Sequence, residues 1–386
     1  MRNRFAVLFN LVEEKNELMP LTERRPVATL PIAGRYRLID FPFSSLTNAK
    51  IKSSALFISG SGRSLYDHVR SGRAWGLDNV TGGGIFTHSH IEKKYDSTNY
   101  YQDHRDYLEK SRSEYVVLLG SNILANVRID SMLNFHLEEE NDLTVAYKKV
   151  PRNKLRKDTI FSRYIFSDTE EKRITKIQPL SDLAMVSTDV MFGLNILIAN
   201  KETFMTYLDK VEAAEELVSV ENILNVAKEN PESKVAGYEY TGYLKAIEDI
   251  ASYFEANMDM LDEDKFNALF YREFPVLTKS KNSAPSYYGK ESEVQNALLA
   301  NDCEIYGEVK DSVVFRKSFI CQRAKIRNSV ILQGAYVDED ADLNYVILGK
   351  RVHVDKGVKL EGTAENPVVV PKNSKVLSSG EIVEGW

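Results

Sequence analysis

The stretch Asp311-Ser312-Val313-Val314-Phe315 returns twice in related form, as Asn328-Ser329-Val330-Ile331-Leu332 and as Asn344-Tyr345-Val346-Ile347-Leu348. The copies begin at 311, 328 and 344, so they lie 17 and 16 residues apart. A plain β-meander would show strict alternation of apolar and polar residues. Here an apolar residue recurs at about every sixth position instead: Val314, Ile320, Ile326, Ile331, Val337, Leu343, Leu348, Val354 and Leu360. Since three such steps make one coil of a hexapeptide β-helix, the repeat predicts a C-terminal left-handed parallel β-helix.

The N-terminal half has a different pattern, in which short apolar runs alternate with helical stretches. Phe5–Phe9, Ser54–Ile58 and Tyr115–Leu119 are too short for helices and are rich in Val, Ile, Leu and Phe, which is typical of interior parallel strands. Helical patterns follow at Ser64–Arg70 and Tyr100–Arg112. This alternation predicts a Rossmann-like α/β domain with a mixed sheet and with ligands bound at the C-terminal ends of its strands.

The change of period sets the expected domain boundaries. We expect an α/β domain over residues 1–262, a linker over 263–295 and the β-helix over 296–386. The linker includes the polar segment Lys279–Pro285. The polar, glycine-containing stretch Asn79–Ser97 is expected to be a loop.

Composition limits the class of function. The chain has 386 residues and a net charge of −6 without a basic block, which argues against nucleic acid as a partner. Cys303 and Cys321 show no disulfide or metal pattern, which fits a reduced cytoplasm. No segment approaches the length and hydrophobicity of a membrane span.

A basic cluster lies near the N-terminus, beside a loop that is poorly suited to phosphate. Leu21–Pro26 and Pro31–Phe41 carry four arginines, at positions 24, 25, 35 and 37. Directly upstream, Asn10–Leu18 has no glycine and has glutamates at 13, 14 and 17. A loop that cradles a triphosphate needs glycines for close backbone approach and cations around its N–H groups. We therefore expect this loop to bind triphosphate poorly.

With these motifs the chain resembles bacterial ADP-glucose pyrophosphorylase (glucose-1-phosphate adenylyltransferase), a family that makes ADP-glucose for glycogen. The resemblance covers essentially the whole chain. Its most specific parts are Leu21-Thr22, Arg25, Ala33–Phe41, Asn48, Ile51, Tyr115–Gly120 and the C-terminal repeats.

The departures from the family are as specific as the matches. Glu17 stands where the resemblance places a triphosphate-binding arginine, and Val27 stands where it places a lysine. Ser121 and Ala246 occupy the positions of two metal-binding aspartates. The resemblance therefore implies no catalytic residue and no metal in this chain, with Mg²⁺ held by an active partner subunit.

Three of the arginines have an expected role in binding an effector. In catalytic relatives, basic residues at the positions of Arg24, Arg25 and Arg37 lie in a site for phosphorylated-sugar effectors. Guanidinium groups suit phosphate because they donate two parallel hydrogen bonds. Solvated or structural ion pairs are the competing interpretation.

The resemblance is strongest to the GlgD-type subunits of Firmicutes, which implies a pseudoenzyme that assembles with a catalytic subunit in a heterotetramer. One alternative is a weakly active nucleotidyltransferase with relocated metal ligands at Glu248 and Asp249. The simpler interpretation is that Asp249 caps the next helix. A sugar-phosphate-binding module without an enzyme partner is a further alternative. A hexapeptide acyltransferase is disfavoured, because the tail offers only His353 as a catalytic histidine.

Overall fold

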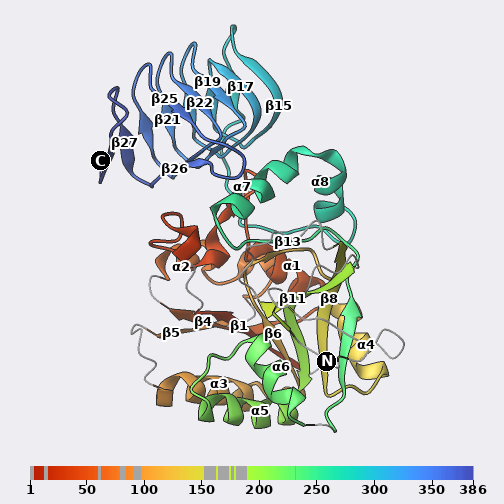
Figure 1. Cartoon of the computed structure of the whole chain (residues 1–386). Coiled ribbons are helices and arrows are strands. Elements are labelled where there is room, and N and C mark those ends of the chain that lie inside the picture. The colour runs from red at the N-terminus through yellow and green to blue at the C-terminus, as the bar shows by residue number, and fades with distance from the viewer. Residues whose placement is uncertain are drawn as a thin grey trace.

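The computed structural model describes residues 4–12, 16–59, 62–78, 84–90, 97–151, 162–163, 174, 178–179, 189–230 and 232–385. Figure 1 shows an α/β domain below and a β-helix above, with helices α7 and α8 between them. No described helix is both long and apolar enough to cross a bilayer.

The α/β domain is built on a seven-stranded sheet with the order β12-β8-β11-β6-β1-β4-β5. Strand β11 runs antiparallel to both of its neighbours, while the other pairs are parallel. The mixed sheet is therefore confirmed. The bounds of its strands are β1 Phe5–Leu11, β4 Ser53–Ser59, β5 Gly84–His90, β6 Tyr115–Leu119, β8 Leu143–Pro151, β11 Asp189–Asn200 and β12 Val235–Glu239.

The three predicted strands are confirmed, but the expected loop Asn79–Ser97 is wrong in its middle. Residues 84–90 of that stretch form the edge strand β5, which pairs in parallel with β4. The polar sequence of this strand led to the prediction of a loop. An edge strand can be polar, because it has a neighbouring strand on one side only and its side chains are partly exposed to solvent.

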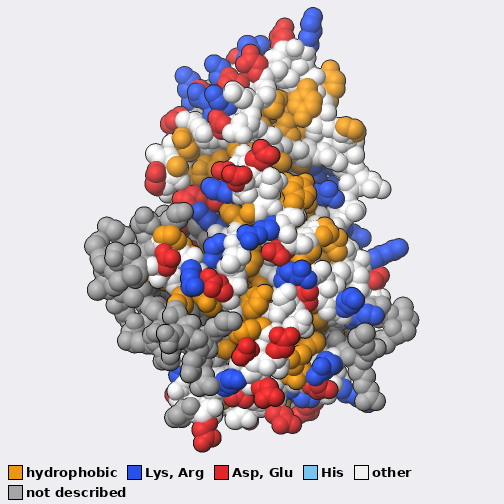
Figure 2. Space-filling view, turned by 90° about the vertical axis from the view of Figure 1, so that its right-hand side faces the viewer, with side chains coloured by type: hydrophobic (Ala, Val, Ile, Leu, Met, Phe, Trp, Pro, Cys, Tyr) orange, Lys and Arg blue, Asp and Glu red, His pale blue; other side chains and the backbone are white. Residues whose placement is uncertain are grey.

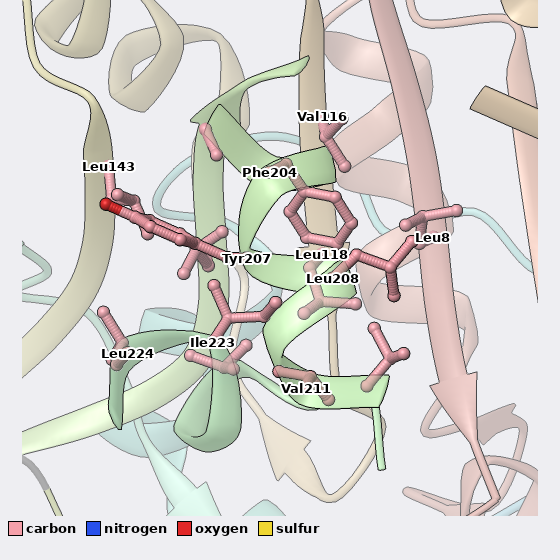
Figure 3. Close-up of a cluster of buried hydrophobic side chains, with 14 of the residues drawn as sticks. Leu8, Val116, Leu118, Leu143, Phe204, Tyr207, Leu208, Val211, Ile223 and Leu224 are labelled. Carbon is pink, nitrogen blue, oxygen red and sulfur yellow. The ribbon is translucent and has the colours of Figure 1, made fainter. Parts of the chain in front are cut away.

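Helices cover both faces of the sheet. On one face lie α3 (Ser97–Ser111), α5 (Lys201–Ala213) and α6 (Val220–Lys228), and their apolar sides form one buried cluster with the strands. Figure 3 shows Phe204 and Leu208 of α5 lying beside Leu118 and Leu8. The other face carries the helices α1 Asp40–Asn48, α2 Arg63–Val69 and α4 Ile129–Glu138.

Three helical segments follow the sheet: α7 (Ile250–Met258), the 3₁₀ turn η6 (Asp259–Leu261) and α8 (Glu263–Phe270). Asp249 caps α7 in a capping box, with its side chain accepting from Ser252 N at 2.7 Å. The predicted linker 263–295 thus includes a helix, and the segment without helix or strand runs only from 271 to 286.

The C-terminal strands form two ladders of a β-helix, in which all pairs are parallel except the terminal pair of β27 and β28, which is antiparallel. One ladder has the order β14-β16-β18-β21-β24-β27-β28 and the other β25-β22-β19-β17-β20-β23-β26, with β15 beside β17. The strand bounds are β14 Tyr287–Tyr288, β15 Glu293–Leu299, β16 Glu304–Ile305, β17 Glu308–Val314, β18 Phe319–Ile320, β19 Lys325–Arg327, β20 Val330–Ile331, β21 Tyr336–Val337, β22 Asp342–Asn344, β23 Val346–Leu348, β24 His353–Val354, β25 Lys359–Glu361, β26 Val368–Val370, β27 Ser374–Val376 and β28 Ile382–Glu384. The residues of the six-residue beat from Val314 to Val354 are fully buried, which confirms the periodicity.

The ladder corrects the register of the third repeat. Val330 pairs with Ile347, and Ile331 pairs with Leu348. The third copy therefore begins at Tyr345, one residue later than the letters suggest. Burial decides this register, because each inward side chain must stack on the inward side chain of the coil below.

Each repeat has two consecutive apolar residues because the β-helix packs on two sides. Val314, Ile331 and Leu348 point into the β-helix core. Their neighbours point outward into a second core shared with α7 and α8. In register these neighbours form one column, with one residue per coil: Leu298, Val313, Val330, Ile347 and Val369.

Candidate functional site

A cleft of about 810 Å³ lies where the α/β domain, the 271–286 segment and the β-helix meet. We call it the basic cleft. Its basic lining residues are Arg24, Arg25, Arg37, Arg63, Arg70, Lys279, Lys281, Arg316, Lys350, Arg351 and Lys372. Among the described residues that line it, Asp67 is the one carboxylate. By contrast, basic and acidic side chains are interspersed on the face shown in Figure 2. The basic cleft is thus a concentrated region of positive charge in an acidic protein.

The N-terminal wall of the cleft is held by a small hairpin. Strands β2 (Pro31–Ile32) and β3 (Tyr36–Arg37) pair through a turn in which Ala33 and Gly34 both have positive φ. The hydroxyl of Tyr253 donates to the carbonyl of Pro31 at 2.7 Å. This contact ties the hairpin to α7.

Arg37 is fixed by its neighbours at the end of this hairpin. Its guanidinium Nη1 donates to the carbonyl of Ser64 at 2.8 Å and lies 3.0 Å from the Ser64 hydroxyl. Its backbone N–H donates to the carboxyl of Asp40 at 2.9 Å. The side chain is therefore oriented before any ligand arrives, which lowers the entropic cost of binding.

Each successive coil of the β-helix contributes at least one residue to the second wall of the cleft. The turn residues Arg316, Gln333, Lys350 and Lys372 line the cleft. Backbone hydrogen bonds connect successive turns, from Gly334 N to Arg316 O and from Arg351 N to Gln333 O, both at 3.0 Å. The bond from Asn373 N to Lys350 O at 2.9 Å continues the series.

The crowding of cations changes their proton affinities. Burial, and then the charge of Arg25, lowers the pKa of Arg37 to about 10. Desolvation of the ammonium group, and then Arg316 and Arg37, lowers the pKa of Lys281 to about 8, although the residue as a whole is exposed. Burial also lowers the pKa of Arg25. An anion in the cleft would relieve this repulsion.

A second hollow of about 360 Å³ adjoins the basic cleft. Tyr36, Phe266 and Leu298 contribute to its more apolar lining. The residues lining both hollows are Pro31, Arg37, His68, Lys279, Lys281, Arg316 and Gln333.

The degenerate catalytic positions lie apart from this cleft. Val27 is the first residue of η2 (Val27–Thr29) and is buried in the core shared with the β-helix, and Glu17 is exposed in η1 (Asn16–Leu18). Glutamates 13 and 14 of the predicted poor phosphate loop lie outside the described residues.

Ser121 and Ala246 are brought together by a two-stranded ladder. Strand β13 (Lys245–Ala246) pairs with β7 (Ile123–Leu124), so that Ala246 lies opposite Ile123. Ile247 N donates to Asn122 O at 2.8 Å, next to Ser121.

The side chains around this ladder do not fit a Mg²⁺ site. Hydroxyl and methyl groups at positions 121 and 246 cannot replace carboxylate ligands. Among the described residues, no group of three or more His, Cys, Asp or Glu side chains is placed to hold a metal ion. Nearby, Lys245 pairs with Glu255 at 2.6 Å, and Asp249 serves as the helix cap.

The sequence identified Arg24, Arg25 and Arg37, and the structure places all three on the basic cleft. It missed Lys279 and Lys281, although both lie in the segment identified as polar. The sequence analysis also missed the cleft residues of the β-helix. They lie more than 250 residues away from the arginines in sequence, so no local motif connects them. His68 was missed as well, since a single histidine in a short helix carries no motif.

Comparison with known proteins first defines the class. Residues 16–157 match the nucleotidyl transferase family, and residues 283–366 match the GlmU-like C-terminal hexapeptide family. The chain is therefore a nucleotidyltransferase-type protein with a hexapeptide β-helix.

Its relatives then define the family. The chain is 31% identical over 373 residues to the glycogen biosynthesis protein GlgD of Bacillus subtilis, covering 96% of this chain and 95% of the relative. It is 26% identical over 371 residues to glucose-1-phosphate adenylyltransferase of Bacillus cereus, covering 92% and 94%. Against the enzyme of the same name from Fusobacterium nucleatum the identity is 28%, covering 80% of each chain. The chain belongs to the ADP-glucose pyrophosphorylase family and is of the GlgD type.

Proposed function

We propose that this chain is a non-catalytic, regulatory subunit of a glucose-1-phosphate adenylyltransferase assembly in glycogen biosynthesis. The assembly would convert ATP and glucose-1-phosphate to ADP-glucose and pyrophosphate. The observation that carries the proposal is the β7–β13 ladder, which brings the segments of Ser121 and Ala246 together without a carboxylate at either position.

The chemistry explains why this ladder argues against catalysis. Adenylyl transfer develops negative charge on the α-phosphate and on the leaving pyrophosphate. Carboxylate-bound Mg²⁺ and basic donors supply the stabilisation of that charge. With Ser121 and Ala246 at the metal positions, and Glu17 and Val27 at the basic ones, no charged group of the expected kind stands at any of the four.

The regulatory half of the proposal rests on the basic cleft. Arg24, Arg25 and Arg37 together with the lysines of the 271–286 segment form a preformed site suited to a phosphorylated effector. We propose that a catalytic subunit of the same family is the partner, within a heterotetramer, and that Mg²⁺ is held by that partner.

An adenylyltransferase assay in both directions tests the catalytic part. It compares this chain alone, the cognate full-motif subunit alone and the two mixed. We expect no turnover from this chain alone, and a mixture that exceeds the partner in turnover or in effector sensitivity. Ordinary turnover by this chain alone would contradict the assignment of Ser121 and Ala246.

Variants of the mixture test the effector site. The double variant Arg25→Ala, Arg37→Ala should abolish the effector response of the complex. Arg73→Ala is the matched control, since Arg73 is exposed and is not part of the cleft lining. An unchanged activation curve in the double variant would rule out the effector role of the cleft.

A further inference from the structure

His68 of α2 occupies an unusual position beside the basic cleft. Its side chain is only 3% exposed, yet the residue lines both the basic cleft and the adjoining apolar hollow. Its Nε2 lies 2.5 Å from Oδ1 of Asp40, whose side chain is fully buried. Its Nδ1 is buried and has no hydrogen-bond partner among the described residues.

These contacts define the protonation of the Asp40–His68 pair. Asp40 already accepts a hydrogen bond from the N–H of Arg37, so its carboxyl group acts as an acceptor and Nε2 of His68 carries the hydrogen. That leaves Nδ1 with a lone pair and no donor. A buried nitrogen without a partner is costly, and protonation of Nδ1 would be the simplest way to make it a donor.

The charges that face His68 act on that protonation in opposite directions. They come from three elements packed around it: Asp40 at the start of α1, Arg37 of β3 and Lys281 of the 271–286 segment. Burial has the largest effect and lowers the pKa of His68; Asp40 raises it, and Arg37 and Lys281 lower it by smaller amounts. With its pKa below the ordinary histidine value, His68 is neutral at pH 7.

We propose that His68 is a further binding residue of the basic cleft and that anion binding is linked to proton uptake by the Asp40–His68 pair. An anion offsets the charges of Arg37 and Lys281 and so removes two of the effects that disfavour an imidazolium beside Asp40. The proton comes from solvent and is held at Nδ1. Linkage then requires that anion affinity rises as the pH falls. This inference rests on the proposed role of the cleft as an anion site.

The structure provides a direct optical reporter. The ring of Trp75 lies 5.5 Å from the ring of His68 in an edge-to-face arrangement, and Trp75 is buried. An imidazolium quenches indole fluorescence, whereas neutral imidazole does so weakly. The chain has two tryptophans, so Trp386→Phe leaves Trp75 as the single emitter.

The experiment titrates the full-length Trp386→Phe protein with sulfate at constant ionic strength. Sulfate is a suitable probe because it stays a dianion between about pH 5.5 and 8, so any pH dependence belongs to the protein. We expect quenching of Trp75 on binding and roughly fivefold tighter binding at pH 5.5 than at pH 7. In His68→Gln both the quenching and this pH dependence should disappear.

The control is His88→Gln in the same background. His88 pairs with Asp103 at 3.2 Å, away from the cleft lining, so this variant should behave like the parent. If His68→Gln fails to fold, calorimetry of the parent in two buffers of different ionisation heat still measures proton uptake on sulfate binding. Uptake of a fraction of a proton near pH 6.5 supports the proposal, and none overturns it.

The outcomes separate the two levels of the argument. Binding that is independent of pH, or a pH dependence retained in His68→Gln, overturns the role of His68 and leaves the anion site intact. No sulfate binding at any pH overturns both this inference and the proposed effector role of the cleft.

Discussion

Replacing Arg37 by methionine should make the ligand-free protein slightly more stable, which is unusual for the loss of a half-buried, hydrogen-bonded arginine. Methionine keeps most of the length of the aliphatic chain and removes the charge. The expectation follows from the position of Arg37 in the basic cleft, where its charge is desolvated and faces Arg25.

The magnitude follows from the pKa of Arg37, which is lowered to about 10. An arginine in water has a pKa of roughly 12.5, and a tenfold change in acid dissociation is about 1.4 kcal/mol. Holding the charge in place therefore lowers the free energy of unfolding by about 3.5 kcal/mol at most, and by about 2 kcal/mol after allowance for solvent screening of a half-buried group. Losing the hydrogen bonds to Ser64 costs about 1 kcal/mol. The net expectation is a gain of about 1 kcal/mol.

Urea unfolding at pH 7 without multivalent anions measures this difference, with Arg73→Met as the matched exposed control. Adding sulfate should reverse the order, because wild type regains stability through binding and the variant does not. A loss of about 1 kcal/mol or more in Arg37→Met without sulfate would refute the reasoning, since it would show that Arg37 is a net stabilising contact.

Three further predictions concern pH dependence, capping and the repeat. The pKa of Lys281 is about 8, below the ordinary lysine value, so the unfolded chain binds the extra proton above that pH. The stability of wild type relative to Lys281→Met should therefore rise between about pH 8 and 10, and urea midpoints that move in parallel would contradict this. Asp249→Ala should cost about 1 kcal/mol through loss of the α7 cap, whereas Asp249→Asn should recover most of it in the same urea assay. Ser329→Ala should lower the free energy of unfolding by about 2 kcal/mol, because Val346 N donates to the Ser329 hydroxyl at 3.1 Å and would be left buried without this acceptor. An unchanged midpoint of thermal unfolding would contradict this prediction.

The prediction from sequence was most accurate for the part of the fold in which buried residues recur with a fixed period. The β-helix followed from its six-residue beat, because every coil must present an apolar residue at the same corner. Matching Asn344 to Asn328 by residue type placed the third copy one residue too early. In the structure Val330 pairs with Ile347, so the third copy begins at Tyr345. Side-chain similarity is a weaker guide to register than the need to stack inward residues.

Each repeat contains two consecutive apolar residues, and the reason for the second one became clear only from the structure. Val313 and Val314 are consecutive, so in a strand they face opposite sides. One fills the β-helix and the other packs against α7 and α8. An apolar residue on the outside of a repeat is thus the sequence signature of a second packed surface.

The candidate site was predictable only in part. Arg24, Arg25 and Arg37 are near one another in sequence and were found, whereas Arg316 and Lys372 reach the same cleft from another domain. The linkage of His68 to Asp40 spans 28 residues and two helices. Such contacts depend on how elements pack, and no local propensity encodes them.

The β-helix wall of the basic cleft has an evolutionary consequence. Arg316, Gln333, Lys350 and Lys372 stand on successive coils, so every coil adds its own side chains to the wall. Duplication or loss of a single coil would change the length of the wall by roughly 4.8 Å, which is the spacing between neighbouring strands. It would add or remove the cleft-lining side chains of one coil and leave the arginines of the N-terminal wall unchanged. If the cleft is the proposed anion site, a duplication of about 17 residues would lengthen it for a longer anion without rebuilding it residue by residue.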